Sequence, residues 1–223
     1  MHVHDLTRFL AELSENNNRA WFVMNKPRYD ILRTEFQELV AKLITDISKF
    51  DPEVAGCNPK KSLFRINRDI RFSKDKSPYK TTFSAAVTAS GLKKPSQSGG
   101  PAYYFHIDAN GTLLIAGGEY MPPPDRLRTI RQHVIDDAAG FGKVLKNKKL
   151  KDAFGDLQAE GKLVRPPKGF DADAPHIEYI KMKSFIVWKE TSLKKIPPAD
   201  LGKELAAEFR NAYPLIAWLT QAK

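Results

Sequence analysis

The chain has 223 residues, a single cysteine (Cys57), and 36 lysines and arginines against 26 acids, so its formal net charge is 36 − 26 = +10. One cysteine excludes an intrachain disulfide and a multi-cysteine zinc site, and it is typical of a reducing compartment. No apolar run approaches the roughly 18 residues of a membrane span, and the N-terminus lacks the basic and apolar regions of a signal peptide. We therefore expect a cytoplasmic protein with no membrane partner.

The first fifty residues show helical periodicity. A short amphipathic helix is predicted by the apolar residues Leu6, Phe9, Leu10 and Leu13. The asparagines at 16–18 predict its end and offer N-caps to the next helix. Pro27 interrupts that next pattern, which predicts either a kink or the first turn of a new helix. Apolar residues from 32 to 50 then recur at helical spacing, so a long helix is predicted to end at Asp51.

The stretch from Phe64 to Lys80 combines a strand-like first half with a basic second half. From Phe64 to Phe72 apolar and polar residues alternate, which predicts a half-buried strand. Arg68 falls on the apolar side of this pattern, where a guanidinium needs a carboxylate or an anionic ligand. From Ser73 onward turn-forming residues lie among lysines, so a loop is predicted to leave the strand.

A sheet is predicted from the middle of the chain. Residues 83–89 form a candidate strand, and residues 91–101, rich in glycine, serine and proline, predict a flexible insert. Two alternating runs, 103–108 and 112–120, flank Asn110-Gly111, which is a strong hairpin signal. At the end of the second run, Gly117-Gly118 permits close backbone approach or a bulge, and Glu119 is suited to a basic neighbour.

The last hundred residues predict mainly helices. These are expected from Pro122 to Val134, at 141–146, around 150–154, at 177–180 and from Leu201 to Phe209, with a strand at 185–188. Tyr213-Pro214 is predicted to break the final helix. No repeat or domain boundary is visible, so we expect one domain over residues 1–223. The order of elements predicts an α+β fold, in which helices from both ends of the chain pack on a mainly antiparallel sheet.

Several motifs follow one another in an order shared by one protein family. They are Asn16-Asn17, Arg19, Trp21-Phe22, Asn25-Lys26 and Tyr29, then most of residues 64–80, and then Gly117-Gly118, Arg131, Pro167-Lys168-Gly169-Phe170, Pro214-Leu215 and Trp218-Leu219. Over nearly the whole chain this pattern resembles the domain of unknown function 2461. The resemblance implies one intact domain and supplies no activity or cofactor. The order Asp173-Ala174-Pro175-His176 departs from the family's usual Asp-His-Pro, so no role for a histidine there carries over.

Basic residues gather in the middle of the chain. Residues 60–80 contain eight lysines and arginines and two aspartates, which is +6 of the total charge. Arginine binds phosphate or carboxylate with two hydrogen bonds, and lysine adds a point charge. The predicted anion-binding residues are Arg65, Arg68, Arg71, Lys74, Lys76 and Lys80. An internal ion-pair network that includes Arg68 and Asp69 is the alternative, and both interpretations remain open.

A wider pocket is predicted to include Asn17, Arg19, Trp21, Asp69, Tyr79 and Lys168. Asn17 and Arg19 either donate hydrogen bonds to a ligand beside a Trp21 wall or cap a helix. Tyr79 either stacks on a base or covers the sheet. Asp69 is expected to orient the neighbouring cations, because the sequence has no recognised metal-ligand spacing. No metal site is therefore predicted.

One strand face offers acid–base chemistry. Tyr104, His106 and Asp108 are expected to share that face, where the histidine serves either as an acid–base group or as a structural residue. Cys57 has no nearby histidine, and the chain contains no phosphate loop, dinucleotide fingerprint or nucleophile elbow.

Three functions are compatible with these residues. The first is the binding of a phosphorylated small molecule or nucleotide through the central Arg/Lys cluster, with catalysis left open. The second is a non-enzymatic nucleic-acid-binding module that uses residues 60–80, with Tyr79 for stacking. The third is a structural or protein-interaction domain whose charges satisfy one another. No cofactor, reaction or oligomeric state follows from the sequence.

Overall fold

The computed structural model of the protein describes residues 2–89 and 100–223. Its helices are α1 (Val3–Glu15), α2 (Arg19–Ser48), α3 (Pro59–Ser62), α4 (Pro124–Asp136), α5 (Ala138–Leu145), α6 (Lys148–Phe154), α7 (Ile177–Ile180) and α8 (Leu201–Gln221). Its strands are β1 (Thr82–Thr88), β2 (Ala102–Asp108), β3 (Thr112–Glu119) and β4 (Phe185–Ser192). Short 3-10 turns lie at Pro52–Val54, Leu193–Lys195 and Pro198–Asp200. Residues 91–99 of the predicted flexible insert lie outside the described residues.

The strands form one antiparallel sheet in the order β1-β2-β3-β4. The predicted hairpin between β2 and β3 is confirmed, with Gly111 at φ 76° in its turn. The Asp108 carboxylate accepts hydrogen bonds from the backbone N–H groups of Asn110 and Thr112, at 2.9 and 2.8 Å, and so closes the turn. Helices from both ends of the chain pack on this sheet, which confirms the predicted α+β fold.

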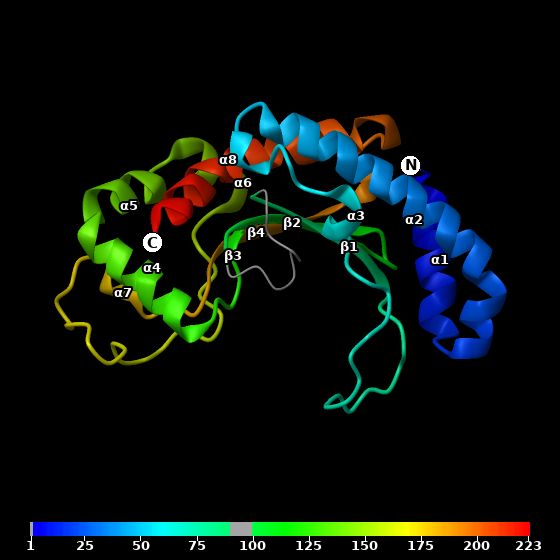
Figure 1. Cartoon of the computed structure of the whole chain (residues 1–223), viewed down its shortest axis with the longest axis horizontal. Coiled ribbons are helices and arrows are strands. Elements are labelled where there is room, and N and C mark those ends of the chain that lie inside the picture. The colour runs from blue at the N-terminus through cyan, green and yellow to red at the C-terminus, as the bar shows by residue number, and fades with distance from the viewer. Residues whose placement is uncertain (1, 90–99) are drawn as a thin grey trace.

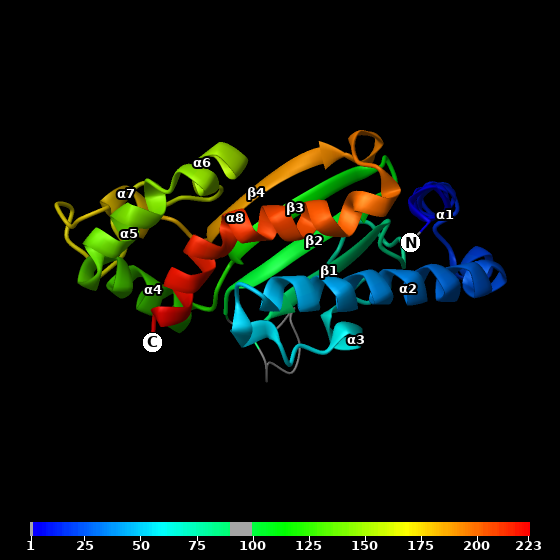
Figure 2. The same cartoon turned by 90° about the horizontal axis from the view of Figure 1, so that it is seen from above.

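Helices cover one face of the sheet and leave the other face concave (Figure 1). Seen from above, α2 and α8 run side by side over the strands (Figure 2). The core lies between these layers, where Phe36 of α2 contacts Phe105 of β2 with ring centroids 5.3 Å apart. Tyr103 and Phe209 make a similar contact between β2 and α8 at 5.4 Å. Alternate residues of the strands therefore face the helices, and the intervening residues face the concave side.

The two glycines at the end of β3 each allow a different segment of the chain to lie close to the backbone. A Cβ on Gly117 would lie 2.6 Å from the Cβ of Ala212, so this glycine lets α8 lie directly on the sheet. Gly118 has φ 127° and lies so close to β4 that a Cβ would meet the carbonyl oxygen of Phe185 at 2.2 Å. The close backbone approach predicted here is therefore confirmed.

Two prolines lie inside helices where the sequence predicts interruptions. Helix α2 runs from Arg19 to Ser48 through Pro27, and α8 runs from Leu201 to Gln221 through Pro214. The predicted break at Tyr213-Pro214 is wrong. A proline removes a single helical hydrogen bond, and the apolar face of α8 remains buried on both sides of it, at Phe209 and Trp218.

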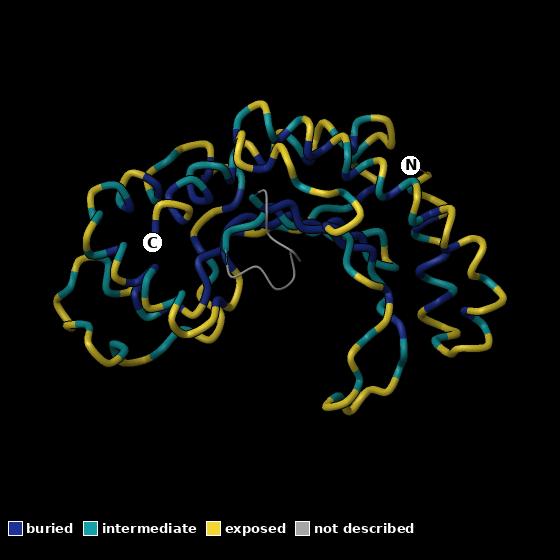
Figure 3. The backbone as a smooth tube through the Cα atoms, viewed as in Figure 1, coloured by how far each residue is buried: buried dark blue, intermediate teal, exposed yellow. Residues whose placement is uncertain are grey.

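The predicted strand from Phe64 to Phe72 is also wrong. Among the described residues, this segment makes one isolated bridge, Asn67 with Tyr79, and Leu63 just before it makes another with Ala85. We call residues 64–80 the arm, because they extend away from the sheet as a loop (Figure 1). The end of the arm is exposed (Figure 3). The alternating pattern failed because Phe72 is 95% exposed, whereas Ile66 at the base of the arm is buried.

Candidate functional site

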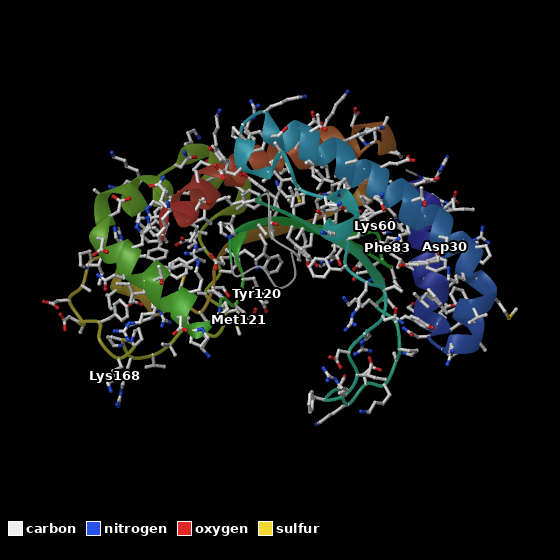
Figure 4. All side chains as sticks on the ribbon, viewed as in Figure 1. Asp30, Lys60, Phe83, Tyr120, Met121 and Lys168 are labelled. Atoms are coloured by element: carbon white, nitrogen blue, oxygen red, sulfur yellow. The ribbon has the colours of Figure 1, made fainter. Side chains whose placement is uncertain are left out.

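The concave face of the sheet is the floor of a cleft of about 680 Å³. Residues from all four strands, from the base of the arm and from the turn after β3 line it: Phe64, Ala86, Gly100, Ala102, Tyr104, His106, Leu114, Ala116, Gly118, Glu119, Tyr120, Met121, Pro122, Pro123, Glu160, Ile186 and Trp188. Figure 4 shows Tyr120 and Met121 on the concave side of the sheet. The volume lies within the usual range of small-molecule sites, roughly 300–1,000 Å³.

Small residues give the cleft its depth. One row across the sheet pairs Ala86 with Tyr104, Tyr104 with Ala116, and Ala116 with Trp188. Tyr104 and Trp188 are two strand spacings apart, so their backbones are separated by roughly 10 Å. Between them lies only the methyl group of Ala116. Gly118 continues this low floor in the neighbouring row. The floor therefore leaves room for a flat group between Tyr104 and Trp188.

A hydrogen-bonded pair, Tyr104 and His106, lies on the β2 side of the cleft. The Tyr104 hydroxyl is 3.1 Å from Nδ1 of His106. Burial raises the pKa of Tyr104, and a hydrogen bond from Ser84 partly offsets that rise. Burial also lowers the pKa of His106, against the opposing effect of Asp108 and Glu190. The imidazole is therefore neutral near pH 7, and the pair can exchange hydrogen bonds with a ligand.

The base of the arm supplies a cationic rim. The Phe64 ring packs edge-on against Tyr104 with centroids 5.7 Å apart, and Nζ of Lys80 lies 5.4 Å from the centroid of the Phe64 ring. Burial and the nearby charge of Arg65 both lower the pKa of Lys80. Neither cation forms an ion pair with an acid among residues 2–89 and 100–223. Lys80 thus lies against a residue that lines the cleft and near the charge of Arg65, which also acts on the Asp69 carboxylate.

The opposite rim is held by a buried ion pair. Glu119, at the end of β3, is 2% exposed and accepts hydrogen bonds from Nε and Nη2 of Arg126, each at 3.0 Å. Arg126 also donates to the carbonyl oxygens of Leu219 (2.9 Å) and Ala222 at the end of α8. Next to this pair, Met121 has φ 44° and donates its backbone N–H to Ser184 Oγ at 2.9 Å. The turn that exposes Tyr120 and Met121 is thereby fixed to the residue before β4 and to the end of α8.

Two of the predicted anion-binding arginines already have acidic partners. Arg71 donates to both carboxylate oxygens of Asp69, at 2.9 and 2.7 Å, and this contact lowers the pKa of Asp69 to about 2. Arg68 pairs with Asp75. The pKa of Asp75 is also about 2, because the Ser77 hydroxyl and amide and then Arg68 bond to its carboxylate. The structure therefore contains part of the internal ion-pair network that the sequence left open.

The other predicted anion-binding residues separate into two places. Arg65 and Lys80 lie at the base of the arm, as described above. Lys74 and Lys76 are exposed near its end, where Lys76 Nζ donates to the carbonyl oxygen of Ile70 at 3.0 Å. The six cations are therefore spread along the arm, and the prediction that they bind anions stays a prediction.

The residues predicted to form a wider pocket do not converge. Asn17 exchanges two hydrogen bonds with the backbone of Tyr79, both at 3.0 Å, and so fastens the arm to the turn before α2. Tyr79 is 7% exposed and stacks on Phe22 at 4.1 Å, so its ring covers the core. Trp21 packs against Phe9 with ring centroids 5.7 Å apart.

The remaining two pocket candidates are exposed. Arg19 lies in the first turn of α2, whose N-cap is Asn18. Lys168 lies at the opposite end of the molecule from Lys60 (Figure 4). No described contact brings either residue to the cleft. These two positions therefore add nothing to the geometry of the site.

Several residues of the cleft were missed because their proximity depends on strand pairing. Trp188 and Ala116 are 72 positions apart and become neighbours only because β4 pairs with β3. One signal was present, since the alternation of residues 103–108 placed Tyr104 and His106 on one face. The structure confirms that the two residues share this face, where they are joined by a hydrogen bond. Neither residue, however, was among the predicted pocket residues.

No group of three or more histidine, cysteine, aspartate or glutamate residues suited to a metal ion occurs in the part of the chain that the structure describes. Within that same part, no helix combines the length and apolarity needed to cross a membrane. The residues that line the cleft offer aromatic surfaces, hydrogen-bonding groups and the carboxylates of Glu119 and Glu160, and Lys80 lies next to the cleft against Phe64.

The environment of His106 predicts a pH effect on stability. Because the folded protein keeps this imidazole neutral below the unfolded pKa of about 6.5, the unfolded state binds more protons as the pH falls. We expect the wild type to lose stability between pH 7.5 and 5.5, and His106→Gln to lose less over the same interval. Urea unfolding of both proteins at the two pH values measures this difference, and equal losses would show that His106 protonates normally in the fold.

Comparison with known proteins identifies the family of this chain. A family model described as a conserved hypothetical protein (DUF2461) matches residues 5–218. No curated protein and no solved structure matches the chain. The matched residues include the arm and all four strands of the cleft floor.

Proposed function

We propose, from the premise that this chain belongs to the DUF2461 family of conserved hypothetical proteins, that it binds a phosphorylated small molecule or nucleotide in the cleft. The family description assigns no activity, so the proposal rests on the site. The observation that carries it is the position of Lys80, whose Nζ lies 5.4 Å from the ring of Phe64, a residue that lines the cleft, and whose pKa is lowered by the nearby charge of Arg65.

The charges at the rim favour an anionic group. A half-buried lysine next to another cation is disfavoured by desolvation and by repulsion, and both effects lower the pKa of Lys80. A phosphate between the two side chains would remove both penalties and accept charge-assisted hydrogen bonds from each. Arg68 and Arg71 differ in this respect, because Asp75 and Asp69 already neutralise them.

The floor of the cleft favours a flat group on the same ligand. Tyr104 and Trp188 present aromatic surfaces on the two sides of Ala116, and aromatic rings bind other rings in offset or edge-on contacts. The Tyr104–His106 pair adds hydrogen-bonding groups at one edge of this floor. A nucleotide, with a ring and a phosphate, matches both parts. We propose binding alone, since the described residues of the cleft include no activated nucleophile.

A thermal-shift screen tests the proposal. The panel contains inorganic phosphate, sugar phosphates, nucleoside mono- and triphosphates, and the uncharged nucleosides as matched controls. A ligand at about 100 times its Kd stabilises by about 2.7 kcal/mol, which raises the Tm of a chain of this size by about 5–10 °C. We expect such a rise for at least one phosphorylated compound and a much smaller rise for its nucleoside. If no anion raises the Tm, the proposal fails and the structural or protein-interaction alternative is favoured.

A further inference from the structure

The end of the arm exposes an aromatic ring. The arm extends away from the sheet and its end is exposed (Figures 1 and 3), and Phe72, in the middle of residues 64–80, is 95% exposed. The Arg71 guanidinium lies 5.8 Å from the centroid of the Phe72 ring, over one face. Most of the ring surface is therefore available to a partner, on a segment that the core does not cover.

The loop that carries Phe72 is held in shape by its own polar contacts. Besides its ion pair with Asp75, Arg68 donates to the Ser77 carbonyl oxygen at 3.2 Å and to Ser73 Oγ at 3.3 Å. The Ser77 amide and hydroxyl donate to Asp75 at 2.9 and 2.7 Å. The Arg71–Asp69 contact holds the segment before Phe72. The ring is thus presented by a preorganised loop, which reduces the entropy lost on binding.

The charge of the arm favours a polyanion. Residues 64–80 contain six lysines and arginines and two aspartates, a net charge of 6 − 2 = +4. Both aspartates pair with arginines inside the arm, and with pKa values of about 2 they remain charged at physiological pH. Among the described residues, Lys74, Lys76 and Lys80 form no ion pair, and Arg65 acts on Asp69 through its charge without a direct ion pair. The positive charge is therefore spread along the arm, from Arg65 and Lys80 at its base to Lys74 and Lys76.

We infer that the arm is a docking element for single-stranded nucleic acid, with Phe72 stacking on a base and Lys74 and Lys76 contacting phosphates. Proteins that bind single strands combine cations along the backbone with aromatic rings on which bases stack. Phe72 takes the stacking role that the sequence assigned to Tyr79, whose ring is covered by Phe22. A membrane surface fits less well, because interfacial binding scales with buried apolar area and the arm offers one strongly exposed apolar side chain. This inference concerns a surface separate from the cleft and does not depend on the proposed function.

Fluorescence anisotropy with a labelled oligothymidylate of about 12 nucleotides tests the stacking contact. Phe72→Ala should weaken binding by about 5- to 150-fold, the usual effect of removing one stacking ring, while Phe72→Tyr should bind like the wild type. Both variants should fold, since the side chain is almost fully exposed. Equal affinities of the wild type and Phe72→Ala would overturn the inference.

The salt dependence tests the phosphate contacts. For single strands the slope of log K against log salt is about −0.7 per phosphate contacted, so Lys74→Gln with Lys76→Gln should make the slope less steep by about 1.4. The matched control is Lys42→Gln with Lys149→Gln, which removes two exposed lysines from α2 and α6 and should leave the slope unchanged. An equal effect of both double variants would overturn the inference.

A membrane outcome is tested with the same variants. Vesicles that contain phosphatidylserine, with phosphatidylcholine vesicles as a control, are sedimented with the protein at about 150 mM salt. We expect no binding that depends on Phe72. If Phe72→Ala abolishes vesicle binding while the wild type fails to bind the oligothymidylate, the arm is a lipid-binding element and the inference is wrong.

Discussion

Replacing Lys80 or Arg65 by alanine is expected to weaken the binding of a phosphorylated ligand by about 10- to 150-fold for each residue. Hydrogen bonds to charged groups contribute about 1.5–3 kcal/mol. Among the described residues, neither Lys80 nor Arg65 forms an ion pair that would compete with the ligand. Each substitution relieves the repulsion between the two cations, which offsets the lost contact of Lys80 with the Phe64 ring or of Arg65 with the charge of Asp69, so the Tm without ligand should change little. Isothermal titration with the best ligand from the thermal-shift screen measures the loss.

Arg71→Ala provides the matched control for these two variants. It also removes a guanidinium from the arm, but one whose two hydrogen bonds already go to Asp69. The Arg71→Ala variant should bind a mononucleotide with an affinity within about twofold of the wild type. This change is smaller than the one that the loss of a charged hydrogen bond usually causes. A loss as large as that of Lys80→Ala would mean that the whole arm, and not the cationic rim of the cleft, holds the phosphate.

Replacing Arg126 by alanine is expected to destabilise the fold by about 3–5 kcal/mol, the usual cost of breaking a buried ion pair from one side. The substitution leaves the buried Glu119 carboxylate and two carbonyl oxygens of the α8 terminus without their donor. For a chain of this size the Tm should fall by about 6–20 °C. Thermal and urea unfolding measure the change.

Two comparisons separate this effect from a general loss of charge. Lys148→Ala removes one partner of the exposed Lys148–Asp152 pair and should leave the Tm within error of the wild type. Replacing both Glu119 and Arg126 by leucine should cost less than Arg126→Ala, because no uncompensated charge stays buried. A double variant that is as unstable as the single one would show that packing, and not the unpaired Glu119 carboxylate, dominates.

The hydrophobic periodicity of the sequence predicted most helices and strands, because each residue of an element is buried or exposed according to the face on which it lies. The alternation of residues 103–108 predicted which residues of β2 share a face, and Asn110-Gly111 predicted the turn. The loop predicted from Ser73 onward is confirmed, whereas the first half of the arm, residues 64–72, was misassigned as a strand for the same reason. Its alternating pattern imitates a strand, yet contacts such as Arg68 to Asp75 and Asn17 to Tyr79 hold it as a loop, and neither pairing leaves a periodic signal.

The candidate site was predicted only in part, because it is made by the order of the strands in the sheet. The sequence identified the basic residues and the shared face of Tyr104 and His106. It could not show that β4 would place Trp188 beside Ala116, nor which arginines the two arm aspartates would neutralise. Proximity across a sheet depends on pairing between distant segments, and one sequence contains no direct record of that pairing.

The indole N–H signals of the three tryptophans provide the most direct test of ligand binding in the cleft. Trp188 lines the cleft, whereas Trp21 packs on Phe9 and Trp218 stacks on His133, both away from it. Assigned by Trp→Phe substitution, the three signals are followed by NMR while a nucleotide is added. We expect the Trp188 signal to shift with saturation and the other two to stay in place. A saturable shift of the Trp21 or Trp218 signal, or binding that leaves Trp188 unchanged, would contradict a ligand site on the concave face.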